Sequence, residues 1–160
     1  IGSDADIAQM YAKYKYAMVT TGQIKTPAVR MRLFGELEKL GIELPVVISP
    51  RAHVSPHARV GEGTIVMHGA LVNAGAVVGR NCILNSQSLV EHDVVLGDHC
   101  HVSTHVAVNS GTRVGNGTFI GSGTTVRQGL TIGDMCVIGM GQRVLADCAS
   151  GSQLPPRKNR

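Results

Sequence analysis

Aromatic side chains are scarce in this sequence, and tryptophan is absent. Phe, Trp and Tyr together make up 3% of the 160 residues. Proteins that bind single-stranded nucleic acids usually stack the bases on aromatic rings, so nucleic acid is not an expected partner. The net charge of +4 instead favours smaller anionic ligands such as phosphorylated small molecules.

Other signals are also missing. No apolar run reaches the roughly 20 residues that span a membrane, no block of five like charges occurs, and no signal-peptide pattern is present. We therefore expect a cytoplasmic protein with no membrane partner. The chain begins with Ile1 rather than Met, and we expect that an N-terminal segment precedes it.

A strict six-residue period organises most of the chain. Every sixth residue from Ile48 to Val144 is aliphatic, seventeen residues in register. An α-helix has a period of 3.6 and a flat strand a period of two, so neither element alone explains the pattern. A period of six predicts a parallel β-helix built from hexapeptide repeats.

The remaining positions of each hexad fit the same fold. Four residues after each aliphatic residue the side chain is mostly small, and three residues after it stand residues that tolerate positive φ. Glycine recurs every eighteen residues, at Gly61, Gly79, Gly97, Gly115 and Gly133. Eighteen residues are three hexads, which predicts triangular coils, about five of them, stacked into a prism roughly 25 Å long.

All four cysteines occupy the small, inward position of a hexad: Cys82, Cys100, Cys136 and Cys148. A catalytic thiol needs exposure and a lowered pKa, so we interpret these residues as reduced core side chains. Reduced cysteines again indicate the cytoplasm. Their spacing does not match a zinc site, and no metal is expected.

The first 47 residues follow a different pattern. The expected elements are a helix over residues 1–15 with a capping pair of Ser3 and Asp6, a strand over Tyr16–Thr20, a helix from Pro27 to Gly41 capped by Thr26, and a strand over Val46–Ile48. The expected apolar stripe of the second helix is Val29, Leu33, Phe34, Leu37 and Leu40. This order predicts a partial Rossmann-like α/β substrate-binding unit over residues 1–47, without a glycine-rich phosphate loop. The β-helix then occupies residues 48–148, and a loose tail follows over 149–160.

Two histidines differ from the others. Three of the seven share the turn position of the hexads and are interpreted as structural: His57, His99 and His105. His92 lies at an outward position in Glu91-His92-Asp93, where carboxylates can orient an imidazole. His101 interrupts a run of apolar residues and therefore needs a partner. Because half a coil separates them, we hypothesise that His92 and His101 meet across the subunit interface of a trimer.

The segment 85–93, Asn-Ser-Gln-Ser-Leu-Val-Glu-His-Asp, and the segment 95–102 that follows it resemble the bacterial NeuD/PglD family of sugar acetyltransferases. The resemblance extends over nearly the whole chain and implies a left-handed β-helix. It implies transfer of acetyl from the co-substrate acetyl-CoA to the amino group of a nucleotide-linked amino sugar, without a metal. Because triangular prisms pack naturally around a threefold axis, we also expect a homotrimer with active sites between subunits. The family includes sialic acid O-acetyltransferases, so transfer to a hydroxyl is an alternative.

The resemblance assigns the catalytic roles to His92 and Asp93. His92 takes the place of the general base, and Asp93 the place of the acidic residue that raises its basicity. The implied reaction is direct: the acceptor attacks the thioester carbon, His92 accepts the proton, and the thiolate leaves. A backbone N–H group or His101 stabilises the oxyanion.

Binding roles follow in the same way. His101 is expected to touch acetyl-CoA, and Ser122 and Met140 to hold its pantetheine arm through backbone groups. Gly22 resembles a glycine that follows a strand of the nucleotide-binding unit. Gly22 and Asn85 are expected to bind the sugar substrate.

Other functions of the same fold remain possible on the sequence. A γ-type carbonic anhydrase needs three histidines on zinc, two of them two coils apart, and no two histidines here are separated by 36 residues. An ice-binding prism needs a flat array of threonines, which only Thr124-Thr125 approaches. A non-catalytic β-helix scaffold would fail to bind acetyl-CoA.

Overall fold

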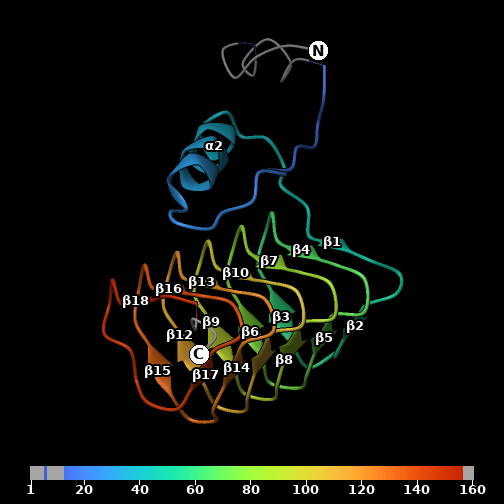
Figure 1. Cartoon of the computed structure of the whole chain (residues 1–160). Helices are drawn as coiled ribbons and strands as arrows, with labels where there is room; N and C mark the ends of the chain where they lie inside the picture. Colours follow the sequence, from blue (N-terminus) through green and yellow to red (C-terminus); the bar gives the residue numbers. More distant parts are fainter. Residues whose placement is uncertain (1–5, 7–12, 157–160) are drawn as a thin grey trace.

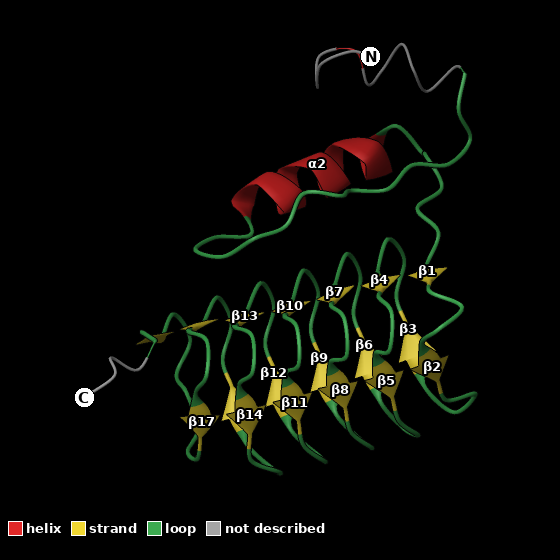
Figure 2. Cartoon of the chain, turned by 45° about the vertical axis from the view of Figure 1, so that its right-hand side comes forward, coloured by secondary structure: helices red, strands yellow, loops and turns green. Residues whose placement is uncertain are grey.

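The computed structural model describes residue 6 and residues 13–156. It is a parallel β-helix with one α-helix among the described residues, α2 (Ala28–Lys39), on one side (Figures 1 and 2). The mainly β class and the hexapeptide coil are confirmed. Most of the helix expected over residues 1–15, including Ser3 of its capping pair, lies outside the described residues.

Each turn of the chain contributes two-residue strands to three parallel sheets, one for each face of the prism. The seven-stranded sheet contains β1 (Val47–Ile48), β4 (Ile65–Val66), β7 (Ile83–Leu84), β10 (His101–Val102), β13 (Phe119–Ile120), β16 (Val137–Ile138) and β18 (Gln153–Leu154). The six-stranded sheet contains β2 (His53–Val54), β5 (Leu71–Val72), β8 (Leu89–Val90), β11 (Ala107–Val108), β14 (Thr125–Val126) and β17 (Arg143–Val144). The five-stranded sheet contains β3 (Arg59–Val60), β6 (Val77–Val78), β9 (Val95–Leu96), β12 (Arg113–Val114) and β15 (Thr131–Ile132).

The six-residue period sets both the core and the register. The second residue of each strand points inward, and Val72, Leu84, Val90 and Ile120 are completely buried. Partner residues are eighteen apart along most of the coil, as in Val47 opposite Ile65. Burying each such side chain contributes about 1.5–3 kcal/mol, so the column of aliphatic residues is the main source of stability.

Positive φ values occur at the turn position, as expected for His99 (61°) and His105 (56°). The prediction is wrong for His57, which is not among the residues with positive φ. Pro56 precedes it, and the Ser55 hydroxyl accepts the His57 N–H at 3.2 Å. A Ser-Pro turn of this kind keeps φ negative at the residue after proline.

The glycines eighteen residues apart stand where neighbouring coils approach most closely. A Cβ atom on Gly79 would lie 2.6 Å from the carbonyl carbon and oxygen of Gly97 in the next coil. No side chain fits at that distance. The eighteen-residue glycine repeat therefore reflects the contact between stacked coils.

The buried cysteines act as hydrogen-bond donors between coils. The thiol of Cys82 donates to the carbonyl of Gly97 at 3.2 Å, and that of Cys100 donates to Gly115 at 3.1 Å. Thr64 makes the equivalent contact to Gly79 through its hydroxyl. Cys82, Cys100 and Cys136 are buried as expected, whereas Cys148 is only half buried.

The coil continues beyond Val144, which corrects the expected end of the repeat. Strand β18 (Gln153–Leu154) pairs with β16, and Cys148 forms a bridge with Ile132. Val137 pairs with Gln153, sixteen residues away, so this last coil is two residues shorter than the others. The shortening breaks the sequence period and leaves Cys148 partly exposed, while the seven-stranded sheet reaches about six coils rather than five.

The N-terminal segment differs from the expected α/β order. Over Tyr16–Thr20 only an isolated bridge forms, between Tyr16 and Glu43. The strand expected at Val46–Ile48 is present as β1, but it pairs with β4 of the β-helix. Residues 47–48 therefore belong to the first coil, because the aliphatic hexad pattern already starts at Ile48.

Helix α2 faces the seven-stranded sheet (Figure 2). The helix begins at Ala28, one residue later than expected, and Pro27 rather than Thr26 is its N-cap. The Thr26 hydroxyl still accepts the N–H of Ala28 at 3.2 Å, and Gly41 has the positive φ (70°) expected after a helix. The expected apolar stripe is partly wrong: Phe34 and Leu37 are buried, but Val29 is 49% exposed and Arg30 is 1% exposed. Arg30, Phe34 and Leu37 follow i, i+4, i+7 spacing, so the buried face includes a cation.

Candidate active site

His101 lies at the centre of the face that the N-terminal segment covers. It is the first residue of β10, between Ile83 of β7 and Phe119 of β13, and its ring packs edge-on against Phe119 at 5.3 Å. The first strand residue points outward, yet His101 is only 8% exposed. Its Nδ1 atom lies 3.0 Å from the backbone oxygen of Gln23, which supplies the polar partner that the sequence predicted.

A first cavity of about 700 Å³ opens on one side of His101. Its lining includes Ser103, Ser122, Met140 and Lys25. The hydroxyls of Ser103 and Ser122 lie 2.8 Å apart, and the other walls are mostly apolar. The cavity brings together His101, Ser122 and Met140, the three residues that the sequence assigned to acetyl-CoA.

A second cavity of about 460 Å³ shares His101 as a wall. Gly22 and Asn85 line it, together with Met18 and Ile83. A methyl group on Gly22 would lie 3.9 Å from Cε1 of His101, so the backbone of this segment passes close to the imidazole. The two residues that the sequence assigned to substrate binding are therefore neighbours of His101.

His92 and Asp93 form a separate exposed pair. Nδ1 of His92 lies 2.9 Å from a carboxylate oxygen of Asp93, and the side chains are 60% and 71% exposed. A carboxylate only accepts hydrogen bonds, so Nδ1–H donates, and in the uncharged form of the ring Nε2 carries the lone pair. Glu91 next to it is fixed by the Asn73 amide, which donates to its carboxylate at 2.9 Å.

Within one chain, His92 and His101 lie on opposite sides of the prism. His92 follows β8 of the six-stranded sheet and precedes β9 of the five-stranded sheet. It therefore stands at the prism edge opposite the seven-stranded sheet that carries His101. The packed core fills the space between them.

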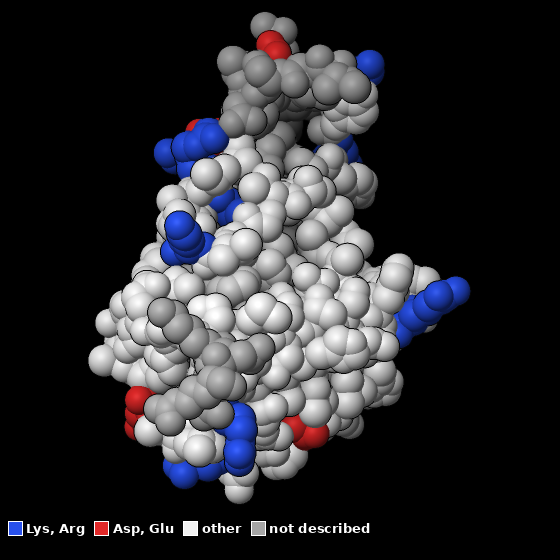
Figure 3. All heavy atoms as spheres, viewed as in Figure 1, with Lys and Arg blue, Asp and Glu red and all other residues white. Residues whose placement is uncertain are grey.

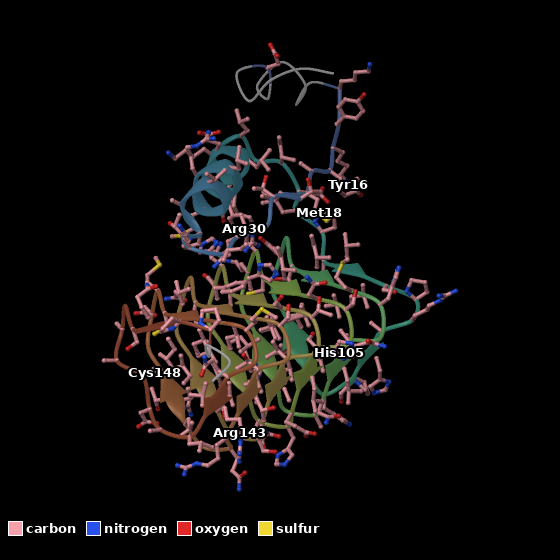
Figure 4. All side chains as sticks on the ribbon, viewed as in Figure 1. Tyr16, Met18, Arg30, His105, Arg143 and Cys148 are labelled. Carbon is pink, nitrogen blue, oxygen red and sulfur yellow. The ribbon has the colours of Figure 1, made fainter. Side chains whose placement is uncertain are left out.

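The sequence interpretation missed three residues behind His101. Arg30, Gln23 and Asn81 are all buried and form a polar cluster between α2 and the β-helix. Figure 4 shows Arg30 at this boundary. The available signal was the i, i+4, i+7 spacing from Arg30, which places a charged residue on the buried face of the helix.

Burial dominates the electrostatics of this cluster. Burial lowers the pKa of His101 to about 4, and the charge of Arg30 adds to the effect. The pKa of His99 is lowered too, chiefly by burial, and burial also lowers the pKa of Arg30. At neutral pH His101 is therefore an uncharged imidazole.

The distribution of charge on the visible face marks no separate anion-binding patch. On the face seen in Figure 3, Lys and Arg side chains are scattered around the edges rather than gathered into one patch. In residue 6 and residues 13–156, no group of three or more His, Cys, Asp and Glu side chains is arranged to hold a metal ion. The helices of the same part of the chain include none that could cross a membrane.

Comparisons with known proteins agree with the fold. The model of the hexapeptide repeat of succinyl-transferase matches residues 111–146. The acetyltransferase domain of PglB from Neisseria gonorrhoeae, solved with acetyl coenzyme A, is 31% identical with a TM-score of 0.90; the match covers 96% of this chain and 73% of that chain. PerB from Caulobacter crescentus, solved with CoA and GDP-perosamine, is 32% identical over 96% and 73% of the two chains, again with a TM-score of 0.90. A search of curated proteins finds no match.

The coils and the matches to known acetyltransferases define a left-handed β-helix protein of the hexapeptide acyltransferase class. At this identity and coverage the chain belongs to the NeuD/PglD-type family, the acetyl-CoA-dependent sugar acetyltransferases that the sequence predicted.

Proposed function

We propose that the chain transfers acetyl from acetyl-CoA to the amino group of a nucleotide-linked amino sugar. The observation that carries the proposal is the arrangement of two cavities around His101 in a chain of this family. One structural relative is PerB with CoA and GDP-perosamine bound. Another is a histidine variant of perosamine N-acetyltransferase from Caulobacter crescentus with the same ligands, 31% identical with a TM-score of 0.91 over 96% of this chain and 72% of that one.

Acetyl-CoA is assigned to the first cavity. The apolar walls suit the pantetheine arm, and Ser122 and Met140 are among the residues that line them. We assign backbone groups of these two residues to the amides of the arm. Lys25 is the one basic side chain among the lining residues, so it can pair with a phosphate of the coenzyme. His101 lies at the inner end that both cavities share.

The sugar nucleotide is assigned to the second cavity and to the N-terminal segment above it. Gly22 and Asn85 contact this space. We propose a substrate-binding unit of Rossmann-like α/β type over residues 1–47, a β-helix acetyltransferase domain over 48–148 and a tail over 149–160. Of the elements expected for the first unit, the described residues contain α2 and the bridge between Tyr16 and Glu43. The boundaries shift slightly because β1 and β18 both pair within the β-helix.

His92 is assigned as the general base. Its Nδ1–H is held by Asp93, so Nε2 is free to accept a proton from the attacking amine. The amine nitrogen forms a bond to the thioester carbon, the carbon–sulfur bond breaks, and the proton taken by His92 passes to the departing thiolate. Asp93 stabilises the imidazolium that forms transiently.

A homotrimer completes the site. Because His92 and His101 lie on opposite sides of one prism, only a second copy can bring a His92 to the cavities beside His101.

The described cysteines are all free, which supports a reducing, cytoplasmic setting.

The test is thiol release from acetyl-CoA with a panel of nucleotide-linked 4-amino sugars and sialic acid. We expect release with an amino sugar and a loss of about 10²- to 10⁴-fold in kcat for His92→Ala. Release of thiol with sialic acid alone would mean that the acceptor is a hydroxyl group rather than an amine. No release and no binding of acetyl-CoA would favour a scaffold.

A further inference from the structure

Arg30 is a buried cation whose contacts are all with neutral groups. Its guanidinium donates to the side-chain oxygen of Gln23 at 2.9 Å, and to the backbone and side-chain oxygens of Asn81. No carboxylate contacts it in the described part of the chain. A guanidinium only donates hydrogen bonds, so both amide side chains must turn their oxygen atoms toward it.

The backbone oxygen of Gln23 determines the tautomer of His101, and the Gln23 side chain holds that oxygen in place. With its oxygen on Arg30, the Gln23 amide nitrogen donates to the backbone oxygen of Gly117 at 3.1 Å. Both ends of the side chain are thus held, and the backbone oxygen of Gln23 faces Nδ1 of His101. A carbonyl oxygen accepts only, so Nδ1 carries the proton and Nε2 carries a lone pair.

The orientation of the Asn81 side-chain amide determines the tautomer of His99, which is the opposite of the tautomer of His101. The Asn81 side-chain oxygen lies 3.1 Å from the Arg30 guanidinium, and its amide nitrogen lies 2.9 Å from Nδ1 of His99. The amide nitrogen donates, so Nδ1 of His99 must accept and Nε2 carries the proton. Two histidines only two residues apart are therefore held in opposite tautomers.

We propose that Arg30 and Gln23 are positioning residues that hold His101 as a hydrogen-bond acceptor toward bound substrate. Nε2 of His101 is buried and has no partner among the described residues, and its ring lines both cavities. The donor it accepts from is a neutral N–H or O–H group, supplied by a pantetheine amide or by the sugar. A backbone N–H group, rather than His101, then stabilises the oxyanion.

This inference rests on the proposed function for the identity of the ligands, but its first test needs no turnover. Nitrogen-15 spectra of histidine-labelled protein at pH 7 report which ring nitrogen of each histidine is protonated. We expect a protonated Nδ1 in His101 and a protonated Nε2 in His99, with the Nε2 signal of His101 moving when CoA or the sugar nucleotide is added. A protonated Nε2 in His101 would overturn the proposal whether or not the chain transfers acetyl.

Substitutions on α2 test the role of the cation. In Arg30→Met the Asn81 amide is free to flip, so we expect His99 to populate both tautomers. Gln23 loses one of the two side-chain contacts that hold its backbone oxygen against His101, so we expect a second tautomer of His101 to appear as well. Arg32→Met is the matched control, because Arg32 lies on the same helix with an exposed ion pair to Glu36, and it should leave both tautomers unchanged. Unchanged tautomers in a folded Arg30→Met protein would remove Arg30 from this role. If Arg30→Met does not fold, the tautomer of His101 in the wild-type spectrum decides whether its Nε2 is an acceptor.

The KM values of a His101 variant show which ligand supplies the hydrogen-bond donor to Nε2 of His101. In His101→Asn the side-chain amide can still donate to the Gln23 carbonyl, while the Nε2 acceptor is lost. Losing one neutral hydrogen bond should raise one KM roughly two- to tenfold. A higher KM for acetyl-CoA assigns the donor to pantetheine, and a higher KM for the sugar assigns it to the acceptor. No change in either KM or in kcat would contradict an acceptor role.

Discussion

His92 and His101 are nine residues apart in the sequence but lie on opposite sides of the packed core of the β-helix. His92 stands at the edge between the six- and five-stranded sheets, and His101 on the seven-stranded sheet. Valine, leucine and isoleucine side chains of the inward column separate them. A site that uses both residues therefore needs two chains.

Asp93→Asn should lower kcat about tenfold with little change in the KM for acetyl-CoA. An amide oxygen can still accept the Nδ1–H of His92, but the difference between a charged and a neutral hydrogen bond is about 1–1.5 kcal/mol. Asparagine tolerates the positive φ of 60° at this position. Asp134→Asn is the control, because its side-chain oxygen only accepts the backbone N–H of Asn116. A loss below twofold in steady-state assays would argue against Asp93 as the partner of the base.

The sequence predicted the β-helix almost completely because each coil repeats the same local requirements. An inward aliphatic residue, a turn residue with positive φ and a glycine at the coil contact all leave a six- or eighteen-residue signal. The last coil was missed because it is two residues shorter, so Gln153 pairs with Val137 out of phase. The Pro56 turn was missed because a local Ser-Pro contact replaces positive φ at His57.

The candidate site was predictable where it lies on the repeat and, outside the repeat, only at Gly22 through the family resemblance. His101 stands out because it interrupts an apolar run, and the structure places Ser122, Met140, Gly22 and Asn85 around it. The cluster behind it was not predictable, because the contacts of Arg30 with Gln23 and Asn81 join segments that share no period. Their separations of 7 and 51 residues follow from how α2 packs on the seven-stranded sheet.

Acid should destabilise the protein partly through His101. Burial lowers its pKa to about 4, whereas an unfolded histidine titrates near 6.5. The unfolded chain therefore binds the proton first, so this contribution to stability is complete above about pH 6.5 and is lost as the pH falls toward 4.

Between pH 7 and pH 5 this loss amounts to about 2 kcal/mol in the free energy of unfolding. Urea denaturation should show a smaller loss for His101→Leu, which restores the apolar stripe of the sheet. His57→Ala, at an exposed turn, should follow the wild type. An equal loss in all three proteins would show that His101 is not held neutral.

Ser88→Ala should be neutral or stabilising by up to about 1 kcal/mol, because the Ser88 hydroxyl is buried without a hydrogen-bond partner among the described residues. Thr118→Val at an equivalent hexad position should cost about 2 kcal/mol. The Thr118 hydroxyl donates to Gly133 at 2.8 Å and accepts the N–H of Cys136 at 3.0 Å. Thermal unfolding of the two variants measures the difference. Equal changes in Tm would mean that the side-chain bonds between coils add no stability.

Gly79→Ala should cost about 2–3 kcal/mol, since the added Cβ would lie 2.6 Å from backbone atoms of Gly97. Gly111→Ala is the matched control: its Cβ would meet nothing within 4 Å, but its φ of 67° imposes strain of about 1–2 kcal/mol. Chemical denaturation should therefore rank Gly79→Ala as the less stable variant. The reverse order would contradict the close contact between coils.

The most direct test of the shared site is complementation between two chains that each lack one of the histidines, assayed at substrate concentrations below the KM values. His92→Ala and His101→Ala subunits are unfolded and refolded together in equal amounts, with mixed trimers verified by native mass spectrometry. If each site takes His92 from one chain and His101 from its neighbour, about one quarter of the interfaces regain both histidines. We expect acetyl transfer at about one quarter of the wild-type rate or slightly more, above the mean of the two pure variants. Activity equal to that mean, in trimers shown to be mixed, would contradict a site built from two chains.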